Sequence, residues 1–209
     1  MLFRSRPKRR TRATIAKEKG LEPLANLILL QKMTETPLEE AKKYINPEKE
    51  VSTAEDALNG AKDILAESVS DNADFRTHIR ELTMKHGQLL SAAKDPEAES
   101  VYEMYYEFSE SLSKLAGHRI LAISRGEKEK FLTVKIEAPT DRILSYLDRK
   151  IITNPQAFTA PVLHEALEDA YNRLIAPAIE REIRNDLFEK AEDGAIDRKS
   201  TRLNSSHRT

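Results

Sequence analysis

The sequence contains no cysteine, which excludes disulfide bridges and thiolate metal sites and is typical of a protein from a reducing compartment. It also lacks any apolar run that approaches the roughly 20 residues of a membrane-spanning helix. The N-terminus is basic, but no apolar stretch of the signal-peptide type follows it. We therefore expect a soluble, cytoplasmic chain with no membrane partner.

Apolar residues are scarce and charged residues are abundant. The hydrophobic share is 39% and the charged share is 33%, against roughly 45–50% and 25% in an ordinary globular domain. A chain of 209 residues is long enough for one substantial core or two small ones. Exposed helices rich in ion pairs fit this composition best.

Motifs for catalysis and metal binding are missing as well. His164 and Glu165 resemble the start of a zinc-protease helix, but Glu168 stands where the second histidine ligand belongs. The remaining histidines considered have no ligand partners at suitable spacing, and the serines of the 109–113 segment lie outside any G-x-S-x-G context. We expect no enzymatic activity, no cofactor and no metal.

Charge is distributed unevenly along the chain. The formal net charge is −1, but residues 1–12 carry +6 and residues 197–209 carry +3, so the body from 13 to 196 carries −10. The basic cluster at the start consists of Arg4, Arg6, Lys8, Arg9, Arg10 and Arg12. Only the ends can attract phosphate through charge alone. The cluster is therefore predicted to be a nucleic-acid-binding arm or loop, and the alternative is a solvated basic loop.

Helical periodicity dominates the body and predicts a mainly α fold. We expect a multi-helix, bundle-like array with helix-turn-helix-type elements and one small two-stranded β ribbon. The ribbon pairs Gln88 to Lys94 with Phe131 to Ile136 in antiparallel fashion, because the second segment alternates apolar and polar residues. The expected helices cover residues 14–31, 37–45, 53–68, 72–87, 96–110, 141–152 and a long stretch after Thr159.

Several local features refine these helices. Ser52 and Glu55 form a capping-box pattern at the start of the third helix. In the 96–110 segment, Val101, Met104, Tyr105 and Phe108 recur at helical spacing and are predicted to face the core, although such aromatics can also stack on single-stranded bases. In the long C-terminal helix, Glu180 is expected to pair with Arg184, four residues further on.

Three stretches carry a family resemblance. GHRILAISRGEKE, from Gly117 to Glu129, resembles the HR-x-L-A-x-x-RGEKE signature of Tex, a family of bacterial transcription accessory proteins. The segments from Pro7 to Ala25 and from Glu165 to Ile196 resemble the same family in the same order. The three matches span nearly the whole chain. Read from its residues alone, the central stretch is a short amphipathic helix in which Gly126 stops or kinks the helix.

The resemblance implies a fragment of a multidomain scaffold that binds nucleic acid, chiefly RNA, and acts in transcription. Such a protein continues into an RNase H-like domain, helix-hairpin-helix elements and an S1-type domain, so its partners are RNA or DNA, its own remaining domains and the transcription machinery. Arg119 and Arg125 are candidates for an interdomain or phosphate contact; alternatively Arg119 forms a structural salt bridge and Arg125 pairs with Glu129. A rival hypothesis is a helical protein-interaction module that never meets nucleic acid.

Charge, composition and the resemblance together divide the chain into three regions. Residues 1–12 form the basic arm, residues 13–196 form an incomplete Tex-like helical region, and residues 197–209 form a tail of different composition. The tail, which begins DRKSTRLNSSH, has no core face and resembles the translation of a sequencing adapter. We expect the tail to be non-native and the chain to be cut at both ends.

Overall fold

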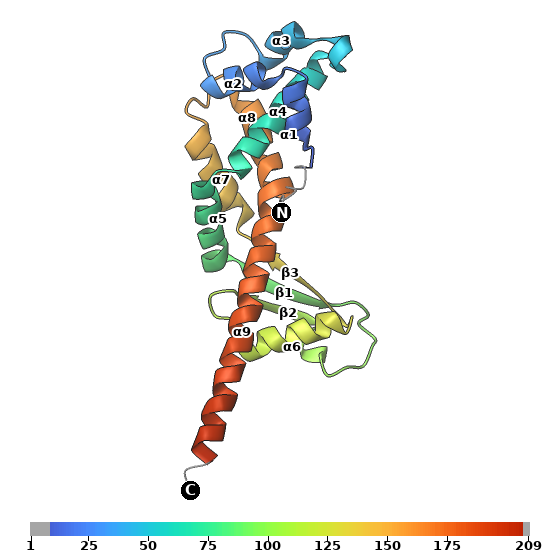
Figure 1. Cartoon of the computed structure of the whole chain (residues 1–209), viewed down its shortest axis with the longest axis vertical. Coiled ribbons are helices and arrows are strands. Elements are labelled where there is room, and N and C mark those ends of the chain that lie inside the picture. The colour runs from blue at the N-terminus through green and yellow to red at the C-terminus, as the bar shows by residue number, and fades with distance from the viewer. Residues whose placement is uncertain (1–8, 207–209) are drawn as a thin grey trace, which may run out of the picture. The chain divides into compact units, whose positions relative to one another are not determined.

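The computed structural model describes the backbone of residues 9–206 and the side chains of residues 9–196 (Figure 1). It divides into two compact units, each built from two stretches of chain. Unit 1 comprises Met1–Arg76 and Leu144–Ile175, and unit 2 comprises Thr77–Ile143 and Ala176–Thr209. The mainly α fold predicted from the sequence is confirmed. In the described residues, no helix is both long and apolar enough to cross a membrane.

The regular structure of the described part of unit 1 is helical, apart from an isolated bridge between Asn46 and Val51. Its elements are α1 (Arg12–Glu18), α2 (Glu22–Leu30), α3 (Pro37–Ala41), the 3-10 turns η1 (Lys42–Tyr44) and η2 (Pro47–Lys49), α4 (Ala54–Ser70), α8 (Ala160–Asp169) and the π-helical turn η4 (Ala170–Ile175). The helices α5 (Ala73–His86) and α7 (Thr140–Ile151) each run across the boundary between the units.

Helix α4 is the centre of unit 1, because α1, α2, α3, α8 and η4 all pack against it. Its small buried residues, Ala57 and Ala61, allow the neighbouring helices to approach closely, and Ile64 and Leu65 continue the same face. This stripe follows the periodicity that the sequence predicted. The core extends into α2 through Leu24, Ala25 and Ile28, all essentially inaccessible to solvent.

Two local predictions in unit 1 are wrong. The expected single helix over residues 14–31 is divided into α1 and α2, because Gly20 adopts a left-handed conformation with φ of 79°. The capping box of α4 is formed by Thr53 and Asp56 rather than by Ser52 and Glu55. Thr53 is extended, with φ of −131° and ψ of 164°, so the helix begins at Ala54, one residue later than expected.

Unit 2 contains a three-stranded antiparallel sheet in the order β2-β1-β3. The strands are β1 (Gln88–Ala93), β2 (Glu107–Ser111) and β3 (Leu132–Glu137), and the unit also contains the 3-10 turn η3 (Glu103–Tyr105), α6 (Gly117–Lys128) and α9 (Ala176–Ser206). The predicted pairing of the segments at 88–94 and 131–136 is confirmed, with Leu90 opposite Lys135 and Ser91 opposite Val134. Helix α6 packs against β3 and α9.

The helix predicted over residues 96–110 is wrong. This segment is a loop followed by η3 and β2, with Leu90 of β1 opposite Ser109 of β2. Val101 and Met104, which helical spacing placed in the core, are 85% and 73% exposed. The predicted burial of Tyr105 is correct, since this ring is 6% exposed and packs edge-on against Phe108. Pairing of β2 with β1 and packing of Tyr102 on Phe131 therefore override the helical period.

Helix α9 also differs from expectation in its ion pairs. Glu180 and Arg184 do not form the expected pair with each other and instead contact β3, while the Arg184 guanidinium also pairs with Glu127 of α6. The buried stripe of Ile179, Ile183 and Leu187 confirms the predicted apolar face. The backbone stays helical through Ser206, so the change of composition at residue 197 brings no break in the helix.

The helical run from α8 through η4 into α9 is widened rather than interrupted near Pro177. Proline has no N–H to donate to the carbonyl of Arg173, four residues earlier, and its ring crowds that carbonyl. The π-helical turn at Ala170–Ile175 lies just before this proline and gives the carbonyl the room it needs. At the start of α8, Thr159 occupies the N-cap position as predicted. Its buried hydroxyl has no hydrogen-bond partner in the described part of the chain.

Candidate nucleic-acid interface

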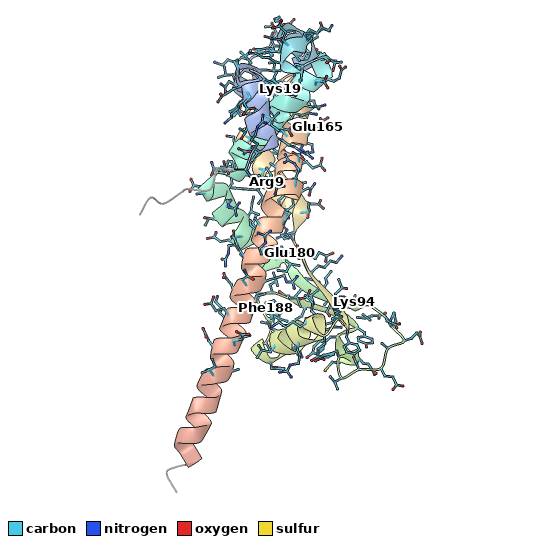
Figure 2. The ribbon with its side chains drawn as sticks, turned by 45° about the vertical axis from the view of Figure 1, so that its right-hand side comes forward. Arg9, Lys19, Lys94, Glu165, Glu180 and Phe188 are labelled. Carbon is cyan, nitrogen blue, oxygen red and sulfur yellow. The ribbon has the colours of Figure 1, made fainter. Side chains whose placement is uncertain are left out.

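The described part of the basic cluster lies at the start of α1. Arg4, Arg6 and Lys8 fall outside the described residues, whereas Arg9, Arg10 and Arg12 are all exposed. Arg12 is the first helical residue, so the boundary predicted after residue 12 lies one residue inside α1. The side chain of Arg9 is labelled in Figure 2.

Two features of α1 determine which way its basic side chains face. The Thr11 hydroxyl accepts a hydrogen bond from the Thr14 backbone N–H at 3.1 Å and thereby caps the helix. Ala13 and Ala16 are buried at 2% and 3% exposure, and α1 packs on α4. Because residues three apart share a helix face, this anchored face leaves Arg12 and Lys17 toward solvent.

The described cations differ in what they contact. The Arg10 guanidinium pairs with the Glu18 carboxylate, and both side chains are more than half exposed. An exposed ion pair of this kind contributes at most about 1 kcal/mol, so phosphate can replace Glu18 as the partner of Arg10 at little cost. Arg9 is exposed and has no ion-pair partner in the part of the chain that the structure describes.

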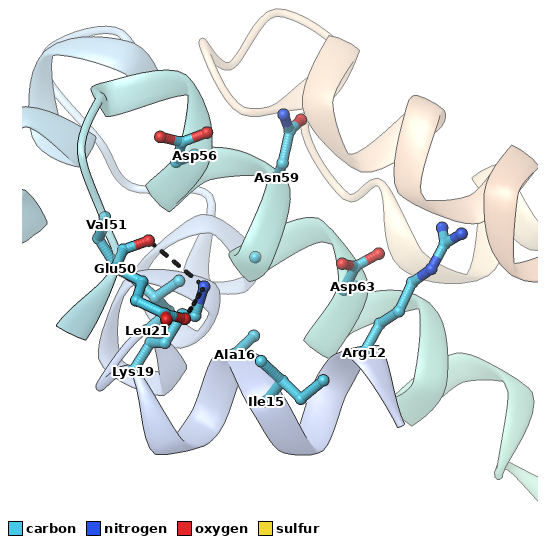
Figure 3. Close-up of a pocket in the computed structure, with 11 residues that line it drawn as sticks. Arg12, Ile15, Ala16, Lys19, Leu21, Glu50, Val51, Asp56, Asn59 and Asp63 are labelled. Carbon is cyan, nitrogen blue, oxygen red and sulfur yellow. Dashed lines mark hydrogen bonds and ion pairs between the residues drawn. The ribbon is translucent and has the colours of Figure 1, made fainter. Parts of the chain in front are cut away.

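Arg12 lines a pocket of about 290 Å³ between α1 and α4 (Figure 3). At one end of this pocket Arg12 lies beside Asp63, and at the other end the Lys19 ammonium donates to the Glu50 backbone carbonyl at 3.3 Å. Asp56 and Asn59 line the same wall as Asp63. With cations and carboxylates at both ends, the pocket has no net preference for an anion.

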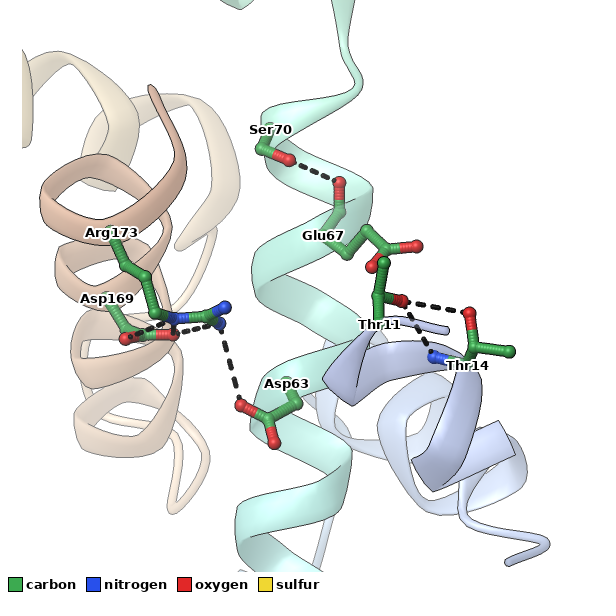
Figure 4. A network of polar contacts seen from close by, with 7 residues as sticks. All are labelled: Thr11, Thr14, Asp63, Glu67, Ser70, Asp169 and Arg173. Atoms are coloured by element: carbon green, nitrogen blue, oxygen red, sulfur yellow. Dashed lines mark hydrogen bonds and ion pairs between the residues drawn. The ribbon is translucent and has the colours of Figure 1, made fainter. Parts of the chain in front are cut away.

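A second polar network holds α8 and η4 against α4 (Figure 4). The Arg173 guanidinium donates to both carboxylate oxygens of Asp169, at 2.7 Å for the shortest bond, and lies 3.6 Å from the Asp63 carboxylate. The hydrogen bonds from Arg173 lower the pKa of Asp169. Burial raises the pKa of Asp63, and the charges of Arg173 and Arg12 oppose that rise. Arg173 is thus committed to internal carboxylates.

In unit 2, Arg119 and Arg125 have different surroundings. The Arg119 Nη1 donates to both oxygens of Glu110 at 2.8 Å, and its guanidinium lies 6.0 Å from the centre of the Phe108 ring. Arg125 is exposed on the last turn of α6. The structure does not bring these two arginines together with residues 9–12 in one unit. Each remains only a candidate contact.

Gly126 has a packing role in this stretch that the sequence did not reveal. The prediction that it stops or kinks the helix is wrong, because α6 continues through it to Lys128. An added Cβ on Gly126 would lie 2.6 Å from Leu132 Cδ1 and 3.1 Å from Tyr102 Cδ1. The glycine therefore allows α6 to approach β3 closely.

Sequence reasoning also missed Lys17, which extends the exposed basic surface of α1 beyond residue 12. The helical spacing of Lys17 from the apolar Ala13 and Ala16 could have indicated that its side chain lies on the exposed face of the helix. In the residues whose placement is described, no three His, Cys, Asp or Glu side chains gather in a way that could hold a metal ion.

The match to a known family covers most of the chain. The sequence profile described as Tex central region-like matches residues 32–198. The chain belongs to this Tex family. The match includes the signature at Gly117–Glu129, α8, η4 and most of α9, but it begins after α1 and the basic cluster.

Curated relatives support the same membership. The chain is 50% identical to the uncharacterized protein YdcI of Bacillus subtilis over 90% of its own length and 27% of that protein. It is 41% identical to protein tex of Bordetella pertussis, covering 65% of this chain and 17% of that one. It is 34% identical to the human S1 RNA-binding domain-containing protein 1, covering 89% of this chain and 20% of that one. The chain thus spans 17–27% of the length of these relatives.

Proposed function

We propose that this chain is a structural segment of a Tex-like transcription accessory protein, and that it contacts RNA or DNA through the phosphate backbone at the basic cluster of residues 4–12. The acidic remainder of the segment serves as a structural support for this contact and for the other domains of the longer protein. In this proposal Arg9, Arg10 and Arg12 contact phosphates, together with Arg4, Arg6 and Lys8.

The observation that carries the proposal is the contrast between the two kinds of arginine. Arg10 pairs with an exposed carboxylate, and Arg9 has no ion-pair partner among the described residues, whereas Arg173 pairs with Asp63 and Asp169 inside unit 1. The family adds support, because relatives are named as transcriptional accessory protein Tex and as an S1 RNA-binding domain-containing protein. The phosphate contact predicted here carries no base specificity.

The test is the affinity of the full chain for a fluorescent 20-nucleotide RNA, measured by anisotropy at two salt concentrations. We expect the triple substitution Arg9→Gln, Arg10→Gln and Arg12→Gln to weaken binding. Three lost phosphate contacts also flatten the slope of log K against log salt by about 2 for single-stranded RNA. Glutamine substitution is preferable to deletion, because deletion would remove the Thr11 cap of α1.

A matched control removes the same charge from unit 2. Lys85→Gln, Lys114→Gln and Lys128→Gln replace three exposed cations and leave the basic cluster intact. We expect this control to bind RNA almost as tightly as the unaltered chain. If both triple variants lose the same affinity, binding depends on total charge and the site assignment is wrong.

A protein-interaction module that never meets nucleic acid is the second candidate. The net charge of −10 over residues 13–196 favours it, because such a body repels a phosphate backbone. Absence of measurable RNA and DNA binding by the unaltered chain at low salt would select this candidate over the first.

A further inference from the structure

The two outer strands of the sheet in unit 2 differ in whether side chains bind the backbone groups of their free edge. On β3, the Ile136 N–H donates to Glu180 Oε1 at 3.2 Å, and the Val134 carbonyl accepts from Arg184 Nη1 at 3.3 Å. Both partners are side chains of α9, which thereby binds two outward backbone groups of this edge. A covered edge cannot add another strand.

The outer edge of β2 has no such cover. The hydrogen bonds from Ala93 to Tyr106 and from Leu112 to Gly87 set the alternation of the ladder. Residues 106, 108, 110 and 112 therefore direct their backbone groups toward β1, and residues 107, 109 and 111 direct theirs outward. Within the described residues, the outward N–H and C=O groups of Glu107 and Ser109 have no protein partner.

The loop that leads into this edge is held by contacts within the loop and by packing on Phe131. The Ser100 Oγ accepts from the Tyr102 N–H at 3.0 Å and lies 2.9 Å from the Tyr106 hydroxyl. Tyr102 packs on Phe131 with 5.9 Å between the ring centres. On this scaffold Val101 and Met104 are exposed, just before β2 begins. Figure 2 shows Lys94 at the other end of the loop, where it leaves β1.

Charge identifies the partner that fits this edge. Residues 94–111 contain Asp95 and five glutamates against Lys94, which gives a net charge of −5. Arg119 neutralises Glu110, but Glu103 and Glu107 are exposed beside the free edge. This field repels a nucleic-acid backbone and also a second copy of the same edge, and it attracts a cationic chain.

We propose that the outer edge of β2 is a docking site for a basic, extended segment of another polypeptide, which adds a fourth strand to the sheet. The backbone groups of Glu107 and Ser109 bind the added strand. Glu103 and Glu107 pair with its lysine or arginine side chains, and the exposed Val101 and Met104 offer apolar contact. This site uses none of the residues assigned to the nucleic-acid contact.

The test uses the full chain and a fluorescein-labelled octapeptide of alternating lysine and valine. Binding is measured by anisotropy, and protection of the Glu107 and Ser109 amides is measured by NMR hydrogen exchange. We expect Ser109→Pro to weaken binding about tenfold, because it removes an outward N–H and blocks the added strand. This substitution leaves the ladder with β1 intact, since the lost N–H faces solvent. Ser109→Ala keeps the N–H and should bind as before.

Further variants and a modified peptide test the two parts of the proposal separately, namely the charge attraction and the backbone pairing of the added strand. Glu103→Gln with Glu107→Gln should weaken binding several-fold and reduce its salt dependence, whereas Glu48→Gln with Glu192→Gln, at exposed positions elsewhere, should not. A peptide with N-methylated valines cannot complete the strand pairing and should lose binding even to the unaltered chain. This arm remains decisive if Ser109→Pro does not fold.

Four outcomes would overturn the proposal. They are equal binding by Ser109→Pro and Ser109→Ala, equal binding of a glutamate–valine octapeptide, protection of amides outside β2, and undiminished binding of the N-methylated peptide. Light scattering that shows a dimer lost in Ser109→Pro would assign the edge to a second copy instead. Protection of the same amides by a 20-nucleotide RNA alone would assign it to nucleic acid.

Discussion

Replacing Gly126 by alanine tests whether the conspicuous glycine of the GHRILAISRGEKE stretch serves packing. The new methyl group would lie 2.6 Å from Leu132 Cδ1, 3.0 Å from Leu132 Cγ and 3.1 Å from Tyr102 Cδ1. Leu132 is 0% exposed and Tyr102 is 5% exposed, so neither side chain can move aside into solvent. The Gly126 carbonyl also accepts from the Phe131 N–H at 2.9 Å, which ties the end of α6 to the start of β3.

Two opposing effects determine the size of the change. Alanine favours a helix interior over glycine by about 1 kcal/mol. Overpacking a buried contact costs typically ~1–3 kcal/mol, and the 2.6 Å approach to a fully buried leucine places Gly126→Ala in the upper part of that range. We therefore expect Gly126→Ala to lower the free energy of unfolding by about 1–2 kcal/mol.

Urea unfolding followed by circular dichroism measures this difference, provided that the slope of the transition is unchanged. Lys128→Ala is the control, because it alters an exposed residue of the same helix and should change stability by no more than about 0.5 kcal/mol. A stabilised Gly126→Ala protein would show that helix propensity outweighs the contact with β3. The packing explanation of this glycine would then be refuted.

Two further predictions concern ion pairs of unit 1. The hydrogen bond to Asp148 raises the pKa of His164. The stability that this bond contributes is therefore fully present below about pH 6.5 and is lost as the pH rises through the higher pKa of the folded state. An NMR titration should show that Asp148→Asn returns the pKa of His164 toward about 6.5. Arg173→Ala should lower the unfolding free energy by about 1–2 kcal/mol at pH 7, because it removes the cation that pairs with Asp63 and Asp169. The lowered pKa of Asp169 means that this loss should diminish as pH falls below about 4, and equal losses at pH 7 and pH 3 in urea unfolding would contradict the assignment.

Periodic segments of the sequence predicted their structure well. The apolar stripe of α4 and that of α9 both face the core, and β1 and β3 pair as expected because their segments fit an extended, half-buried strand. Family resemblance and residue pattern also agreed on a mainly α fold. In each of these segments, local propensity and tertiary packing favour the same structure.

The sequence-based predictions are wrong where contacts between residues far apart in the sequence determine the local structure. The 96–110 segment has a helical apolar period, but pairing with β1 and packing of Tyr102 on Phe131 make its end a strand. Glu180 and Arg184 have the spacing of a helical ion pair, yet a sheet edge offers them backbone partners. At the candidate nucleic-acid site, the sequence located the cations. Only the structure shows Arg10 beside Glu18 and Arg12 beside Asp63.

The most direct test of the central claim is the salt dependence of RNA binding by a variant with all six cations of residues 4–12 changed to glutamine. If all six contact phosphates of single-stranded RNA, the slope of log K against log salt is about −4 for the unaltered chain. We predict that the variant binds weakly, with a slope near zero. An unchanged slope would show that the phosphate contacts lie elsewhere in the chain and would contradict the proposed function.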